Sequence, residues 1–112
     1  MNIRTQIIIV LLGLGLAASG GAEVISKAYE LKLSNFQAPA SQNGSVIFKE
    51  CDDCSPVIVR VTAATRYAIN GTEVGLTDFA KAIMQANDRE NTFVGVLHHL
   101  ESNTVKSIAV WI

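Results

Sequence analysis

Two cysteines give this sequence the one motif that is suited to chemistry. Cys51 and Cys54 enclose two aspartates in a C-x-x-C spacing. Such a pair can form a structural disulfide, exchange thiols in a redox reaction, or supply half of a zinc site. The three interpretations call for different surroundings, so the neighbouring residues discriminate between them.

A structural disulfide between Cys51 and Cys54 is the interpretation that the spacing favours. The pair lies between two strand-like runs, where a hairpin would turn. A four-residue turn brings its end Cα atoms within about 7 Å, and disulfides accept Cα separations of about 4.4–6.8 Å. The closed loop is short, so its chain-entropy contribution is only about 2 kcal/mol. We expect a staple that holds the turn.

A redox-active pair is the first alternative. In thioredoxin-like proteins the C-x-x-C motif opens a helix whose N-terminus lowers the thiol pKa. Here Ser55-Pro56 and a β-branched run follow the motif. The negative charges of Glu50, Asp52 and Asp53 also disfavour a thiolate. These neighbours argue against a reactive cysteine, and thiol-redox chemistry stays the second choice.

Metal binding is the other alternative. His98 and His99 could complete a zinc site, but adjacent residues on a strand point to opposite faces, and the usual H-x₃₋₅-H spacing is absent. Glu50, Asp52 and Asp53 could hold a hard cation only weakly, because no EF-hand-like loop surrounds them. The sequence therefore predicts no bound metal and no other cofactor.

The remaining polar residues form no recognisable catalytic pattern. Thr65 and Ser107 are isolated hydroxyls without a base or an orienting acid. We expect one of the two histidines to face solvent and the other to be partly covered. Trp111 is expected to plug the core or contact an edge, and not to form a ligand platform. We predict that the protein is not an enzyme.

The N-terminus has the layout of a secretory signal peptide. Arg4 precedes an apolar run at residues 7–16, and small residues follow at positions 17–22. The apolar run is about half the 20 residues that a membrane-spanning helix needs. We predict cleavage after Ala22, or alternatively after Gly20, which leaves no stable membrane anchor. A periplasmic or secreted location would also supply the oxidising conditions in which disulfides form.

The charge balance gives no reason to expect a nucleic-acid partner. The chain has 9 basic and 10 acidic residues. Removal of residues 1–22 takes away only Arg4 among them, so the mature chain would have a formal net charge of −2. Binding to nucleic acid or to an anionic membrane calls for a basic surface.

Hydrophobic periodicity predicts several strands and one helix within a single domain at residues 23–112. Strict alternation marks a strand at residues 28–33, and a polar loop follows at 34–44. Asn70-Gly71 is a strong signal for a two-residue type I′ hairpin. Thr77 suits a helix N-cap, and the helix would bury Phe79 and Ile83. The other expected strands are residues 46–49, 57–62, 65–69, 92–100 and 104–112.

This order of elements predicts an α+β fold. We expect a small, antiparallel, strongly twisted sheet with one helix packed on it or plugging one end. A partly open β-barrel or roll and a closed small barrel are both compatible with the pattern, which does not distinguish between them.

One phrase of the sequence resembles small exported bacterial proteins of unknown function. In these proteins a T-R-Y-x-x-N-G hairpin is followed by L-x-D-F, as in residues 65–71 and 76–79 here. The resemblance covers less than a quarter of the chain. It implies export and a β-rich fold, and it implies no activity.

Taken together, these features predict an exported, non-enzymatic interaction or accessory module, periplasmic or secreted. Its partner would be a protein or a small molecule that the sequence does not identify. The alternative is a thiol-redox or metal-handling protein that uses the pair Cys51 and Cys54.

Overall fold

The computed structural model describes residues 25–112, and the predicted signal peptide at residues 1–22 lies outside them. The described part of the chain forms one sheet of eight strands and one α-helix, so the expected β-rich fold with a single helix is confirmed. In chain order the elements are β1 (Ser26–Lys32), the 3-10 turn η2 (Leu33–Asn35), β2 (Phe36–Gln37), β3 (Ser45–Phe48), β4 (Val57–Arg60), β5 (Arg66–Ile69), β6 (Thr72–Val74), α1 (Leu76–Gln85), β7 (Phe93–His99) and β8 (Thr104–Trp111).

The sheet is open and is not closed into a barrel. Its strand order is β1-β7-β8-β4-β3-β2, and β5 pairs with both β8 and β6. The expected antiparallel pairing holds for β1 with β7 and for the hairpins, but β8 pairs in parallel with β4 and β5. The reason is that β5 continues in the direction of β4 after a short link, so that both strands run along one edge of β8.

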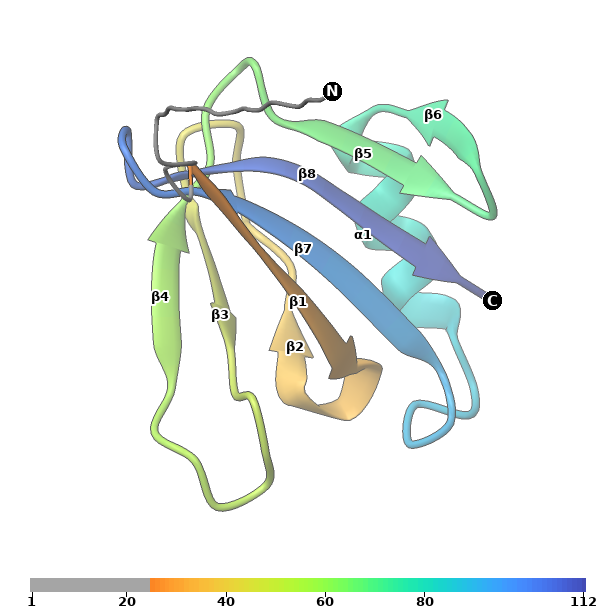
Figure 1. Ribbon diagram of the computed structural model, residues 1–112. Helices are drawn as coiled ribbons and strands as arrows, with labels where there is room; N and C mark the ends of the chain where they lie inside the picture. The colour runs from red at the N-terminus through yellow and green to blue at the C-terminus, as the bar shows by residue number, and fades with distance from the viewer. Residues whose placement is uncertain (1–24) are drawn as a thin grey trace, which may run out of the picture.

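The sheet is curled, with the helix on its inner side. Figure 1 shows β1, β7, β8 and β5 side by side, with α1 behind them and β1 passing across β2 and β3. Across this opening the ring centroids of Tyr29 on β1 and Phe48 on β3 lie 4.8 Å apart. The inner face of the sheet therefore encloses the core, and the outer face points away from α1.

Alternation along the strands separates core from surface. On β7 and β8 buried side chains alternate with more exposed ones. The helix contributes Phe79 and Ile83, which are buried as predicted, and the Phe79 ring lies 5.1 Å from that of Tyr67. The buried apolar side chains are Leu31, Leu33, Phe36, Val46, Phe48, Val59, Val61, Tyr67, Phe79, Ile83, Val94, Val96, Val105, Ile108 and Val110.

The start of α1 differs from the prediction. The N-cap is Gly75 and the helix begins at Leu76, whereas Thr77 was expected to be the cap. Gly75 has an extended conformation, and its carbonyl oxygen accepts a hydrogen bond from the Phe79 amide at 3.0 Å. No side chain caps the helix, but Asp78 places a negative charge in its first turn. The backbone of Gly75 therefore begins the helix without a side-chain cap.

The Asn70-Gly71 hairpin is confirmed. Both residues have positive φ, 51° and 87°, and the flanking residues Ile69 and Thr72 pair directly. The Asn70 side chain also continues the ladder between β5 and the chain end: its amide donates to the Ile112 carbonyl oxygen at 2.9 Å, and its oxygen accepts from the Ile112 amide at 2.8 Å. One asparagine thus supports the turn and holds the end of β8.

An irregularity in β8 marks the place where its neighbour changes from β4 to β5. Val105 pairs with His98, and Ser107 pairs with Leu97, so Lys106 is an extra residue on β8. A bulge of this kind leaves local backbone groups without partners in the ladder.

The side chain of Thr65 supplies the missing partner at this junction. Its buried hydroxyl donates to the Val105 carbonyl oxygen at 2.7 Å and accepts from the Thr62 amide at 3.0 Å. The Thr65 amide in turn donates to the Thr62 carbonyl oxygen at 3.1 Å, which closes the turn between β4 and β5. The hydroxyl that the sequence left without a role is a structural link between three strands.

Replacing Gly71 by alanine should lower the free energy of unfolding by about 1–2 kcal/mol, because alanine is strained at positive φ. A Cβ at Gly71 would meet no atom within 4 Å, so the loss would come from the backbone alone. Gly75→Ala is the matched control, since Gly75 also has open space but a negative φ. Urea denaturation of both variants measures the difference; equal losses would contradict a conformational requirement at Gly71.

Replacing Thr65 by valine should lower the free energy of unfolding by about 1–3 kcal/mol, because a buried carbonyl and an amide both lose a partner. Thr65→Ser keeps the hydroxyl and should recover most of this loss. Urea denaturation and amide exchange at β8 report the effect. If serine and valine destabilise equally, the methyl packing of Thr65 matters and its hydrogen bonds do not.

Candidate functional site

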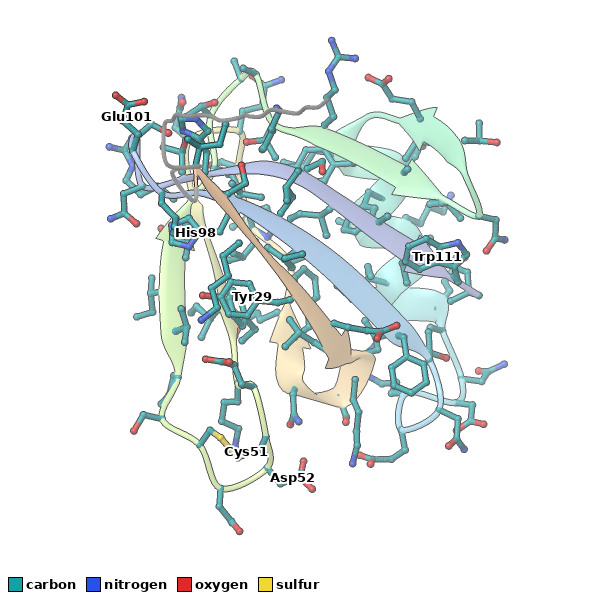
Figure 2. All side chains as sticks on the ribbon, viewed as in Figure 1. Tyr29, Cys51, Asp52, His98, Glu101 and Trp111 are labelled. Carbon is teal, nitrogen blue, oxygen red and sulfur yellow. A yellow bond between two sulfur atoms is a disulfide. The ribbon has the colours of Figure 1, made fainter. Side chains whose placement is uncertain are left out.

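The cysteine turn joins β3 to β4 at one end of the sheet. The sulfur atoms of Cys51 and Cys54 lie at disulfide-bonding distance, with their Cα atoms 5.0 Å apart, within the range expected for a turn. The Cys54 amide donates to the Cys51 carbonyl oxygen at 3.1 Å, which makes the turn itself hydrogen-bonded. Figure 2 shows Cys51 and Asp52 at the tip of this loop, far from Trp111.

Asp52 fastens the cysteine turn to the first strand and the turn after it. The Asn35 side-chain amide donates to Asp52 Oδ1 at 3.0 Å, and Lys32 Nζ lies 3.6 Å from Asp52 Oδ2. Lys49 Nζ donates to the Asp52 carbonyl oxygen at 3.0 Å. We call Lys32, Asn35, Lys49 and Asp52 the Asp52 clasp. It joins the end of β1 and the turn η2 to the loop that follows β3.

The charged groups in and beside the clasp shift one another's pKa values toward the ionised forms. The hydrogen bond from Asn35 and the nearby Lys32 ammonium hold the pKa of Asp52 below its usual value. Hydrogen bonds from Ser34 and Lys32 lower the pKa of Glu90, whose carboxylate lies 3.3 Å from Lys32 Nζ. The hydrogen bond to Glu90 and the charge of Asp52 raise the pKa of Lys32. All these groups are exposed, so they fix geometry more than they add stability.

This arrangement offers little to a reactive thiol. The strand β4 begins at Val57, shortly after Cys54, so the motif does not open a helix whose dipole would stabilise a thiolate. The Asp52 carboxylate is fixed beside the turn by Asn35 and Lys32. The geometry suits a cross-link that shapes a turn better than it suits thiol exchange.

The two histidines lie on opposite faces of β7, as their adjacency requires. His98 is buried, and its Nε2 lies 2.8 Å from Asn103 Oδ1. His99 is partly exposed, and its Nδ1 lies 2.9 Å from Ser102 Oγ. Each histidine thus bonds to the turn between β7 and β8. Within residues 25–112 no three His, Cys, Asp or Glu side chains are grouped to hold a metal ion.

Two buried side-chain atoms of the described residues have no hydrogen-bond partner. They are the Tyr67 hydroxyl oxygen and His98 Nδ1. Tyr67 lies between the sheet and α1, and its burial raises the pKa of the phenol. An unpaired buried hydroxyl costs stability relative to a hydrogen in its place.

Of the two positions expected for Trp111, a core plug or an edge contact, the structure excludes the core plug. Its side chain is 56% exposed on the outer face of β8, so it does not plug the core. Phe93, its direct partner on β7, is 46% exposed. Because Ile108 and Val110 point inward, alternation sends Trp111 outward. That period-two pattern was the signal in the sequence that could have identified these two surface aromatics.

A second surface feature is a shallow groove of about 680 Å³ between α1 and the loop before β3. The loop lines it with short side chains such as Pro39 and Ala40, and the helix contributes Met84, which is 82% exposed. The groove is therefore open to solvent and not an enclosed cavity.

Comparison with protein-family models, curated proteins and solved structures finds no match to this chain. No helix in residues 25–112 is long and apolar enough to cross a membrane.

A double Cys51→Ser/Cys54→Ser variant should lower the free energy of unfolding by about 2 kcal/mol, because the turn loses its cross-link. Asp53→Asn is the control, since Asp53 lies in the same turn and makes no side-chain bond with a described residue; it should change stability by less than about 0.5 kcal/mol. Urea denaturation measures both. Unchanged stability together with rapid thiol exchange with glutathione would support a redox pair instead.

Replacing Tyr67 by phenylalanine should raise the free energy of unfolding by about 1 kcal/mol, because an unpaired buried hydroxyl is removed. Since burial raises the pKa of Tyr67, the phenol ionises at lower pH in the unfolded chain than in the folded one. The free energy of unfolding of the unaltered protein should therefore fall as pH rises above about 10. The advantage of phenylalanine should therefore grow in alkali. A stability loss at neutral pH would indicate that the hydroxyl has a partner.

Proposed function

We propose that the chain is an exported, non-enzymatic interaction module that works in the periplasm or outside the cell. The signal-peptide pattern at residues 1–22 supports export. The pair Cys51 and Cys54 at disulfide distance also supports it, because paired cysteines are typical of oxidising compartments.

The observation that carries the proposal is the pair of exposed aromatic side chains on the outer sheet face. Phe93 and Trp111 are cross-strand neighbours, and about half of each side chain is accessible to solvent. Large contiguous apolar patches on a surface mark contact sites, and tryptophan is enriched at binding hot spots. By contrast, the polar groups that could do chemistry are engaged: Thr65 at the strand junction and Asp52 in the clasp.

The proposal can be tested by photocrosslinking in cells that export the protein. A benzophenone amino acid at Phe93 should yield discrete crosslinked products, and the same group at Ile58 should not. Ile58 is the matched position, because it is 65% exposed on β4, away from Phe93. The crosslinks should persist when Cys51 and Cys54 are both serine.

Two outcomes would contradict this function. Equal labelling from Phe93 and Ile58, or none from either, would remove the case for a contact site on the outer face. Loss of crosslinks in the double serine variant, with the fold intact, would favour the alternative of a thiol-redox protein.

A further inference from the structure

The outer face carries a small surface, formed by Phe93 and Trp111, that we call the aromatic platform. The two residues are paired directly across β7 and β8, near the C-terminal end of β8. Figure 2 shows Trp111 in front of the strands, on the side away from α1. No described segment covers this side.

The indole of Trp111 reaches across β7 toward β1. A Cβ at Gly95 would lie 3.6 Å from Trp111 Cζ3 and 3.8 Å from Cη2, so the outer edge of the indole lies against Gly95. Gly95 has no side chain to hold the indole away from the sheet. The aromatic ring is therefore in contact with the backbone of β7 and still more than half exposed.

Glu30 is the residue of β1 that pairs with Gly95, the glycine against which the indole lies. Cβ atoms of directly opposed residues are about 4.5–5.5 Å apart. Both residues point to the outer face, since Leu31 next to Glu30 is buried. The Glu30 side chain is exposed and makes no hydrogen bond or ion pair with a described residue.

The charges around Glu30 leave its carboxylate without a counter-ion from the described chain. Lys32, on the same face of β1, is the direct partner of Phe93 on β7 and is engaged by Glu90 at 3.3 Å and by Asp52 at 3.6 Å. Arg66 is held by both carboxylate oxygens of Glu73 at 3.1 Å. Of the two charged residues of β1 opposite the platform strand, Lys32 is paired with carboxylates and Glu30 has no counter-ion among the described residues.

We propose that this surface binds an arginine side chain of a partner protein, an inference that rests on the proposed interaction function. A cation over an indole is attracted by the ring quadrupole. A planar guanidinium can stack on the ring and give two parallel hydrogen bonds to the Glu30 carboxylate, whereas an ammonium is a compact point charge that cannot do both as well.

Trp111 is the single tryptophan of the chain, so its fluorescence reports directly on the platform. The probe is a capped peptide that alternates glycine and arginine, compared with lysine and citrulline versions of the same length. Citrulline keeps the shape of arginine without its charge. The exported protein should give a saturable emission change with the arginine peptide, a weaker one with lysine and none with citrulline, and affinity should fall as salt rises.

Glu30→Gln should weaken binding of the arginine peptide by about 2- to 5-fold, the range expected for an exposed ion pair. Glu101→Gln is the matched control: it makes the same charge change at the other end of the β7–β8 hairpin, as Figure 2 shows, and should leave affinity unchanged. Phe93→Ala should also weaken binding. Circular dichroism checks that each variant is folded, and the salt dependence of the unaltered protein needs no variant.

Equal responses to arginine and citrulline peptides, or equal effects of the two glutamate variants, would overturn the proposal. So would sedimentation showing that a second copy of the chain occupies the platform. If crosslinks at Phe93 persist while the arginine peptide fails to bind, the interaction function stands and the guanidinium assignment is wrong. If both fail, the outer face is not a binding surface.

Discussion

The described structure depends on one strand having two partners along a single edge. β8 pairs with β7 on one side, while β4 and then β5 run beside it on the other. The change of partner coincides with the extra residue Lys106, and the Thr65 hydroxyl bonds to the Val105 carbonyl at this point. A buried carbonyl without a partner costs free energy. This hydrogen bond therefore satisfies the Val105 carbonyl at the point where the sheet divides into a β4–β3–β2 part and a β5–β6 part. The part that ends in β2 curls toward β1, and the part that ends in β6 is followed along the chain by α1.

The division of the sheet also explains how the polar side chains are used. The open sheet has no ladder between its edge strands β1 and β2, and the Asp52 clasp joins the end of β1 to the loop after β3 through exposed polar and charged side chains. The Asn70 side chain performs the matching task at the end of β8, where it pairs with Ile112. These residues replace ladder hydrogen bonds that the topology cannot supply.

Local features were predictable from the sequence, and long-range features were not. Asn70-Gly71 encodes its turn through positive φ at adjacent residues, and Cys51 and Cys54 encode a turn through their spacing. The parallel pairing of β8 depends on strands about 40 residues apart, for which periodicity carries no information. The clasp likewise joins Asp52 to Lys32, two residues that nothing in the local pattern connects. The direction of Trp111 was predictable in principle, since the buried positions of β8 determine it by alternation.

The position of the exposed aromatics is the structural feature that folding alone does not explain. Five of the seven aromatic side chains lie in or against the core, where they contribute most of what a large apolar group can contribute. Phe93 and Trp111 remain about half exposed on the outer side of the same strands.

The stability of the fold would be served as well by polar residues at these two positions, because the core already lies on the inner face. Gly95 lets the indole lie against the backbone between the strands, and Glu30 is the residue of β1 that pairs with Gly95. The indole is in contact with the backbone of β7, on the outer face of the sheet and away from the cysteine turn. The cysteine pair and the aromatic platform therefore lie at separate places in the fold, the former at the β3–β4 turn and the latter on the outer face of β7 and β8.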